Sequence, residues 1–308
     1  MVRETSQNAH KCKGDPVSHV DEEIASQPAC WNLAVELAAR SAAALPGPGE
    51  RVAVLGCGTS WFMAMAYATL REAAGQGETE AFAASEFPVR RRYDRVVAIT
   101  RSGTTTEVLA ALAATDAPTT ALVGDPESPA AKKAGDAILL PFADERSVVQ
   151  TRFATSALIL LRAHLGEDLS TAAGDAADAI GAPLPLDPGG TEQVTFLGRG
   201  WTVGLAHEAA LKCREAATFW SESYPAMEYR HGPIAIAAPG RAVWAFGEVP
   251  DGLPEQVEAT GATFVHNGHG DPLAELIVAQ RFAVAAAAAR GLDPDHPRHL
   301  TRSVILSA

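Results

Sequence analysis

Three charged residues share one face of a predicted helix. Glu208, Lys212 and Glu215 follow one another at intervals of four and three residues, a spacing that brings side chains together on an α-helix. The rest of the segment is largely alanine and leucine. A solvated stripe of paired charges is the ordinary interpretation of this pattern. A carboxylate beside an ammonium can also move a proton, so the spacing alone leaves both interpretations open.

A histidine follows this helix on a polar segment. Residues 221–233 form a predicted polar loop with aromatic side chains, which ends in His231-Gly232-Pro233. Imidazole titrates near neutral pH, and proline restricts the backbone beside it. Together with the charged helix, His231 favours acid–base chemistry over a solvated surface.

Two hydroxyl-rich turns lie earlier in the chain. The turn Gly56-Cys57-Gly58-Thr59-Ser60 follows one apolar run, and the turn 101–106, with Ser102, Thr104 and Thr105, follows another. Turns at the ends of neighbouring parallel strands converge on one crevice, where hydroxyl and backbone N–H groups suit phosphate oxygens. Plain strand-to-helix turns and N-caps would use the same residues. A dinucleotide site is not indicated, because Trp61 stands where its third glycine would be, and no Walker lysine motif occurs. The two turns together favour a phosphate site.

Strand-like and helical segments alternate along the chain. We predict strands at 51–55, 95–100, 119–123, 137–140, 193–197, 241–246 and 263–266, and helices at 28–44, 61–73, 152–164, 202–217 and 273–289. Such alternation predicts an α/β fold in which parallel sheets are covered by helices on both faces.

An internal repeat divides the chain. Residues 183–190 are rich in proline and glycine and predict a linker. After it, Phe196-Leu197-Gly198-Arg199-Gly200 repeats the pattern of Val54-Leu55-Gly56-Cys57-Gly58. We therefore expect two copies of one α/β unit, residues 22–182 and 191–308, preceded by a disordered tail at 1–21.

Composition narrows the class of protein. The 308 residues have room for about two domains of roughly 150 residues. A net charge of −12 without a basic stripe argues against nucleic acid as a partner. The cysteines form no C-x-x-C pair, so we expect free thiols and no metal. The polar start of the chain and the lack of a charge-free apolar run of about 18 residues predict a cytoplasmic protein with no membrane span.

These segments together resemble the double-SIS (sugar isomerase) family. The first half is similar to a SIS domain, and the second resembles the catalytic half of the isomerase domain of glucosamine-6-phosphate synthase and its glutaminase-free relatives. The matching segments are Gly56–Ser60, Ala84–Phe87, Ser102–Thr105, Leu197–Gly200, Glu208–Glu215, Glu228–Pro233 and Asp295–Val304. The resemblance implies two tandem SIS domains, each a parallel sheet flanked by helices in a flavodoxin-like α-β-α sandwich.

The resemblance also implies roles for individual residues. Glu215 would move a proton between C1 and C2 of a hexose phosphate, while Lys212 would position substrate hydroxyls and hold Glu215 charged. His231 would open the sugar ring and reach in from the partner subunit of a homodimer. The segment 145–151 would close over the site, with Gln150 where the synthase has a serine. The sugar phosphate would be held by Cys57, Gly58, Thr59, Ser60, Ser102, Thr104 and Thr105.

One position departs from the synthase pattern. Arg302 stands where the synthase has the lysine that forms an imine with the open-chain sugar, and a guanidinium stays protonated and cannot act as that nucleophile. Of the five lysines in the chain, only Lys212 lies within a motif. We also expect no glutaminase, and so no glutamine-derived nitrogen. The sequence therefore favours aldose–ketose isomerisation of a hexose or amino-hexose 6-phosphate, with or without release of ammonia, and no cofactor. A non-catalytic sugar-phosphate sensor is the alternative.

Overall fold

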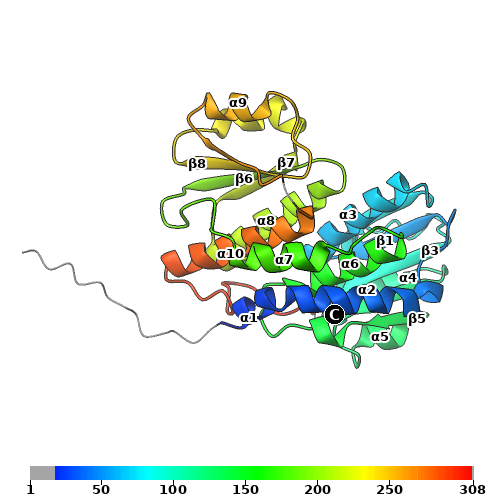
Figure 1. Ribbon diagram of the computed structural model, residues 1–308. Helices are drawn as coiled ribbons and strands as arrows, with labels where there is room; N and C mark the ends of the chain where they lie inside the picture. Colours follow the sequence, from blue (N-terminus) through cyan, green and yellow to red (C-terminus); the bar gives the residue numbers. More distant parts are fainter. Residues whose placement is uncertain (1–17, 269, 307–308) are drawn as a thin grey trace, which may run out of the picture.

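The first parallel sheet contains five strands (Figure 1). The computed structural model of the chain describes residues 18–268 and 270–306. In this sheet the strand order is β2-β1-β3-β4-β5, and all neighbouring strands are parallel. The strands are β1 (Val52–Gly56), β2 (Thr79–Ala83), β3 (Arg95–Thr100), β4 (Thr119–Val123) and β5 (Asp136–Leu139).

The second parallel sheet contains four strands in the order β7-β6-β8-β9. They are β6 (Gln193–Gly198), β7 (Ser221–Pro225), β8 (Arg241–Phe246) and β9 (Thr263–Val265). In Figure 1, α9 (Leu253–Glu258) covers the outer face of this sheet, and α8 (Thr202–Ala217) and α10 (Pro272–Ala289) lie on its other face.

The remaining helices surround the first sheet. They are α1 (His19–Ala25), α2 (Gln27–Arg40), α3 (Thr59–Ala73), α4 (Thr106–Ala114), α5 (Pro129–Lys133), α6 (Arg152–His164) and α7 (Ala172–Gly181). Short 3-10 turns are η1 (Ala42–Ala44), η2 (Ala84–Glu86), η3 (Pro141–Ala143), η4 (Glu228–His231) and η5 (Pro233–Ile236). The prediction of an α/β fold with parallel sheets flanked by helices is confirmed.

Central and edge strands differ in burial. β1, β4 and β6 are buried along their whole length, because helices cover both faces of each sheet. β2 and β7 are edge strands and are only partly buried. We predicted residues 221–233 as a loop, but Ser221–Pro225 form β7, which pairs with β6 from Val194–Ser221 to Gly198–Pro225. Pairing with a buried neighbour outweighs the polar character of this short segment.

The same strand–turn–helix unit occurs in both sheets. A Cβ atom on Gly56 would lie 2.4 Å from the carbonyl carbon of Ser60, and one on Gly198 would lie 2.2 Å from the carbonyl oxygen of Thr202. Glycine alone therefore lets each helix begin directly against its strand. The second glycine of each turn, Gly58 or Gly200, has a φ of 53° or 57°.

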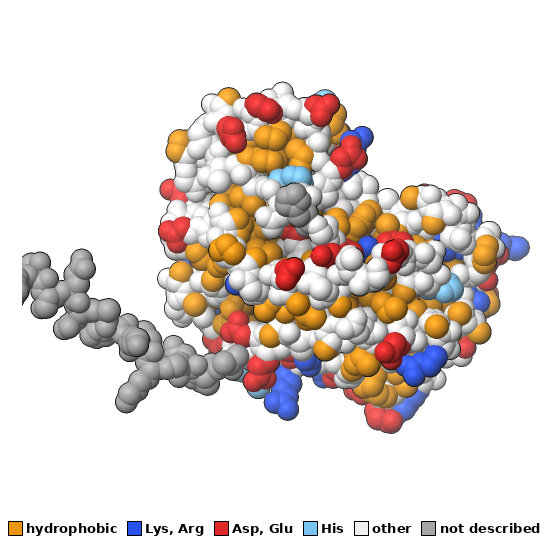
Figure 2. Space-filling view, in the orientation of Figure 1, with side chains coloured by type: hydrophobic (Ala, Val, Ile, Leu, Met, Phe, Trp, Pro, Cys, Tyr) orange, Lys and Arg blue, Asp and Glu red, His pale blue; other side chains and the backbone are white. Residues whose placement is uncertain are grey.

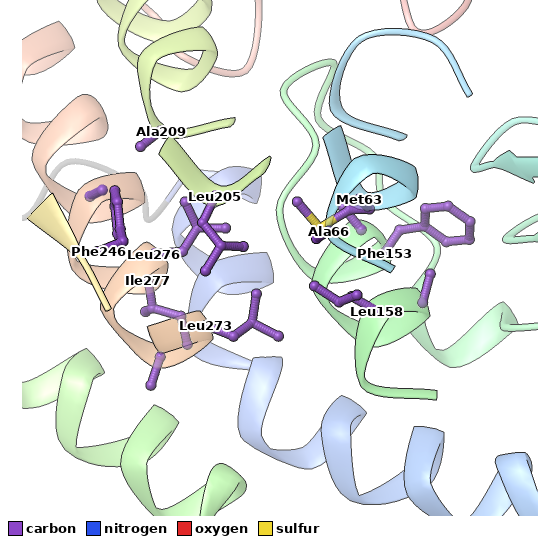
Figure 3. Packing of buried hydrophobic residues seen from close by; sticks show 14 of the residues in the cluster. Met63, Ala66, Phe153, Leu158, Leu205, Ala209, Phe246, Leu273, Leu276 and Ile277 are labelled. Carbon is purple, nitrogen blue, oxygen red and sulfur yellow. The ribbon is translucent and has the colours of Figure 1, made fainter. Parts of the chain in front are cut away.

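One hydrophobic core connects the two sheets (Figure 3). It includes Met63 and Phe153 beside the first sheet and Leu205 and Leu276 beside the second. Helices α3 and α8 approach closely at Gly204, where a Cβ atom would lie 2.4 Å from the carbonyl oxygen of Phe62. The helices that follow the two Gly-x-Gly turns therefore pack directly on each other.

Helix α10 is the only one in the described ranges that is long and apolar enough to cross a membrane by length and composition. In this fold 67% of it is buried, and it packs against α8 and α7. Apolar residues on every side of a helix are what a core position requires.

The two ends of the described chain lie together. We predicted a disordered tail over residues 1–21; residues 1–17 lie outside the described residues, but α1 begins at His19. The Asp295 carboxylate accepts hydrogen bonds from the backbone N–H groups of His19 (2.7 Å) and Val20 (2.8 Å). Ser18 caps the helix by accepting from Asp21 N–H. A partner far along the chain therefore fixes where the first helix starts.

Candidate active site

The two hydroxyl-rich turns of the first sheet converge. β1 and β3 are adjacent, so the turns that follow them open at the same edge. Between them lies a small cavity of about 30 Å³. Six of the residues that line it were predicted from the sequence as site residues: Cys57, Ser60, Ser102, Thr105, Gln150 and Arg302. We call this cavity with its lining the cradle.

The polar lining of the cradle suits an anion. Arg101 and Arg302 both line it, in a chain of net charge −12 whose visible face in Figure 2 carries scattered acidic side chains. Two guanidinium groups at one cavity create a local positive potential that the net charge does not reveal. Gln150 Oε1 is buried without a hydrogen-bond partner among the described residues, so it is available to a ligand hydroxyl. Burial, and secondarily the Glu107 carboxylate, raises the pKa of the Cys57 thiol.

Three of the residues predicted to bind the phosphate do not line the cradle. Gly58 shapes the turn through its positive φ. Thr59 is buried, and its hydroxyl accepts a hydrogen bond from Lys212 Nζ at 3.0 Å. The Thr104 hydroxyl lies 3.0 Å from Ser102 Oγ and 2.9 Å from Ser303 Oγ. Thr59 therefore contacts α8, and Thr104 contacts the C-terminal segment.

The charged face predicted for 202–217 is buried. Lys212 and Glu208 are each 1% exposed, whereas the Glu215 side chain is 20% exposed. Lys212 Nζ donates to Glu215 Oε2 and lies 3.4 Å from Glu208 Oε1. The interpretation of a solvated charge stripe is therefore wrong, because α8 turns these residues toward α3 and away from water.

The ammonium of Lys212 contacts three oxygens. It donates hydrogen bonds to the Thr59 hydroxyl and to Glu215, and it lies 3.4 Å from Glu208 Oε1. Burial alone would lower the pKa of Lys212, but the neighbouring carboxyl groups of Glu208 and Glu215 outweigh it and raise that pKa. Lys212 thus holds a stable positive charge beside Glu215.

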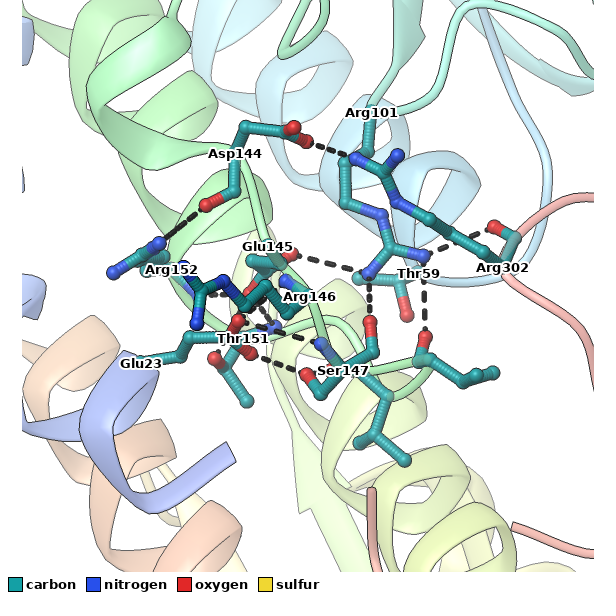
Figure 4. A network of polar contacts seen from close by, with 12 residues as sticks. Glu23, Thr59, Arg101, Asp144, Glu145, Arg146, Ser147, Thr151, Arg152 and Arg302 are labelled. Carbon is teal, nitrogen blue, oxygen red and sulfur yellow. Dashed lines mark hydrogen bonds and ion pairs between the residues drawn. The ribbon is translucent and has the colours of Figure 1, made fainter. Parts of the chain in front are cut away.

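A second buried network closes the cradle from the side (Figure 4). Arg101 is buried and donates to the carbonyl oxygens of Ser147 (2.9 Å), Val148 (3.2 Å) and Arg302 (3.0 Å). It also pairs with Glu145 at 3.4 Å. One side chain therefore connects the turn after β3, the segment 145–151 and the C-terminal segment.

Hydrogen bonds to the Glu145 carboxylate hold the segment 145–151 together. Glu145 Oε1 accepts hydrogen bonds from Thr151 N–H (2.6 Å), the Thr151 hydroxyl (2.9 Å) and Arg152 N–H (2.8 Å). Burial raises the pKa of Glu145, and the Arg101 charge opposes that rise. Glu23 on α1 accepts from Arg146 N–H at 2.6 Å and from the Ser147 hydroxyl. The roles of Arg101 and Glu23 could not be predicted from the sequence, because their partners lie far away along the chain.

The C-terminal segment crosses the edge of the first sheet. Arg302 pairs with Asp144, and Val304 O accepts from Thr106 N–H at 3.2 Å. Leu306 N–H donates to Thr106 Oγ1 at 2.9 Å. Arg302, which the resemblance places at the position of the imine-forming lysine, thus lines the cradle.

His231 stands apart from this group. It ends η4, is exposed, and makes no hydrogen bond with any residue that the structure describes. Among the described residues it therefore forms no hydrogen bond or ion pair with Lys212 or Glu215. In the described ranges, no group of three or more His, Cys, Asp or Glu side chains could hold a metal ion.

Several known proteins are similar to this chain in sequence. No protein-family model matches the chain. A glutamine–fructose-6-phosphate aminotransferase (isomerizing) from Gloeobacter violaceus is 30% identical over 314 residues, covering 83% of this chain and 52% of that protein. The protein of the same name from Sulfolobus acidocaldarius is 27% identical, covering 82% of this chain and 50% of that protein. The chain spans about half the length of these curated relatives.

Solved structures extend the similarity. Glucosamine-6-phosphate deaminase from Thermotoga maritima has a TM-score of 0.81 at 26% identity, covering 94% of this chain and 100% of that chain. Tagatose-6-phosphate ketose/aldose isomerase from Escherichia coli has a TM-score of 0.77 at 17% identity, covering 92% and 97%, and shares the fold.

The fold is thus an α/β fold in which the cradle and the buried charged face of α8 are connected through Thr59. In sequence the chain is similar to about half the length of isomerizing fructose-6-phosphate aminotransferases, and in structure it is similar to a glucosamine-6-phosphate deaminase.

Proposed function

We propose that this chain moves a proton between C1 and C2 of a hexose or amino-hexose 6-phosphate. The observation that carries the proposal is the position of Glu215: it is the partly exposed member of a buried charged group, and it pairs with Lys212. Lys212 in turn bonds to Thr59 in the turn that forms the cradle. A base held at a set place relative to an anion site is what proton transfer on a phosphorylated sugar requires.

The names of the relatives support this substrate class. They include an isomerizing fructose-6-phosphate aminotransferase, a glucosamine-6-phosphate deaminase and a tagatose-6-phosphate isomerase. All three names contain a hexose 6-phosphate. We therefore assign the phosphate to the cradle and the open-chain C1–C2 end of the sugar to Glu215.

The proposed steps use only groups of the chain and water. The cradle hydroxyls and guanidinium groups hold the phosphate. The Glu215 carboxylate takes the proton from one carbon while Lys212 keeps the carboxylate in place. A neutral sugar then forms an enediol, and an amino sugar forms an enolamine. Glu215 then returns the proton to the neighbouring carbon. For an amino sugar, the product is a ketimine, and water adds to it and releases ammonia with the ketose phosphate.

Arg302 favours this non-covalent course over amino transfer. A guanidinium cannot form the imine that the synthase lysine forms. Lys212 is buried and held protonated, so it is not a free amine either. Arg302 instead adds a positive charge at the cradle.

The proposal includes an assembly. We propose two tandem SIS domains, residues 22–182 and 191–308 with a linker at 183–190, in a homodimer. His231 of the partner subunit would then open the sugar ring. The exposed position of His231, which makes no hydrogen bond with a described residue of its own chain, supports this. A shared site makes a two-fold symmetric dimer the simplest arrangement.

A substrate panel tests the proposal. The purified chain is incubated with hexose 6-phosphates, amino-hexose 6-phosphates and the unphosphorylated sugars, while ketose and ammonia are followed. We expect turnover of at least one phosphorylated sugar and loss of that turnover in Glu215→Gln. Binding without turnover across the panel would contradict the proposal and establish the sugar-phosphate sensor instead.

A further inference from the structure

Glu208 is a buried carboxyl group that the proposed mechanism does not use. It is 1% exposed, and neither of its oxygens accepts a hydrogen bond from a described residue. Its nearest charge is Lys212 Nζ, 3.4 Å from Oε1. A buried carboxylate without hydrogen bonds is costly to ionise.

Two carboxyl groups compete for one ammonium at this place. Lys212 Nζ hydrogen-bonds to Glu215 Oε2, while the contact with Glu208 is longer and is an ion pair without a hydrogen bond. One positive charge neutralises one carboxylate, so a second ionised carboxylate would be left uncompensated in a region closed to water. The hydrogen bond therefore pairs the Lys212 ammonium with the Glu215 carboxylate.

Charged groups on the surrounding elements do not change which carboxyl group pairs with the Lys212 ammonium. Glu145, from the segment before α6, acts on Lys212 and belongs to the Arg101 network, and α3 contributes only the Thr59 hydroxyl. Other groups near α8 pair elsewhere: His207 with Ser223, Arg214 with Ser221 O, Glu222 with Tyr224, Glu275 with Trp244, and Arg281 with Ala179 O.

We propose that Glu208 is a positioning residue for proton transfer: it stays protonated in the working enzyme, which leaves the Lys212 ammonium to Glu215. When Glu208 ionises at higher pH, a second negative charge enters the site and draws the ammonium away from Glu215. The enediolate that develops in the reaction then meets extra negative charge, so the rate falls. Burial, partly offset by Lys212, raises the pKa of Glu208 to about 8, which sets the range in which this change occurs.

The test is the pH dependence of kcat/KM, and it rests on the proposed role of Glu215. We expect the wild type to lose activity above about pH 8. Glu208→Gln cannot ionise and should lack this alkaline fall, whereas Glu208→Asp should retain it. Glu275→Gln is the control, because Glu275 is a second buried carboxyl whose pKa burial raises and which lies on α10. An alkaline fall that persists unchanged in Glu208→Gln would overturn the proposal.

Infrared spectroscopy separates this proposal from the function itself. The substrate-free wild type should show a protonated carboxyl band at neutral pH that disappears on alkaline titration. That band should be absent from Glu208→Gln and shifted in Glu208→Asp, which also decides the matter if one variant fails to fold. A wild-type band that is the same in either variant would overturn the proposal. Failure of the substrate panel would instead refute the function and leave the infrared result standing.

Discussion

Lys212 on α8 donates a hydrogen bond to the Thr59 hydroxyl on α3 at 3.0 Å, inside the protein. Thr59 follows the first Gly-x-Gly turn, and Lys212 lies on the helix that follows the second. This contact therefore connects the two copies of the strand–turn–helix unit. It also fixes the distance between the cradle and the pair of Lys212 and Glu215.

Removing the Thr59 hydroxyl should disturb both stability and catalysis. Thr59→Val keeps the shape of the side chain but leaves one donor of a buried ammonium unpaired, which costs about 1.5–3 kcal/mol. We expect a lower urea midpoint and a lower kcat. Thr69→Val is the matched control, because its hydroxyl only bonds to Met65 O on an exposed part of the same helix. If the two variants had the same urea midpoint and the same kcat, the Lys212–Thr59 hydrogen bond would contribute to neither stability nor catalysis.

The cradle should distinguish phosphorylated from unphosphorylated sugars. Ser102 is 7% exposed and lines the cavity, so Ser102→Ala should weaken binding of a hexose 6-phosphate by about 1–3 kcal/mol. Thr104→Ala should act only through Ser102 and Ser303 and weaken binding less. Calorimetry measures both. Equal affinities of the wild type for glucose and glucose 6-phosphate would contradict a phosphate site.

Arg101 should stabilise the closed arrangement of three segments. Arg101→Met leaves Glu145 without its partner and three carbonyl oxygens without a donor, and removal of one member of such a buried pair costs about 3–5 kcal/mol. We expect a large fall in the free energy of unfolding and faster proteolysis of the C-terminal segment. Arg92→Met, at an exposed arginine, is the control. Unchanged proteolysis would mean that Arg101 does not hold the segment.

Mixed dimers test whether two chains share a site. Glu215→Gln and His231→Ala should each be inactive alone. If His231 acts across the interface, half of the randomly mixed dimers contain one intact site, and about a quarter of the wild-type activity returns. Absence of recovery after demonstrated subunit exchange would place His231 and Glu215 of one chain in the same site.

The central strands were predictable because burial on both faces leaves a continuous apolar run, as in β1, β4 and β6. The edge strands β2 and β7 escaped prediction because they are short, half-buried and partly polar. The spacing of Glu208, Lys212 and Glu215 placed them on one face of a helix, but only the packing of α8 on α3 shows that this face is buried. The Arg101 network was not predictable, since it joins Glu23, Glu145 and Arg302 across long stretches of sequence.

The most direct test of the account is proton exchange at the sugar carbons. Incubated in deuterium oxide with its phosphorylated substrate, the wild type should introduce deuterium at C1 or C2, as followed by NMR. Glu215→Gln should bind the substrate with unchanged affinity but slow the exchange by about 10²–10⁴-fold, because the interaction is needed in the transition state. Exchange at the wild-type rate in Glu215→Gln would contradict the assignment of Glu215 as the base.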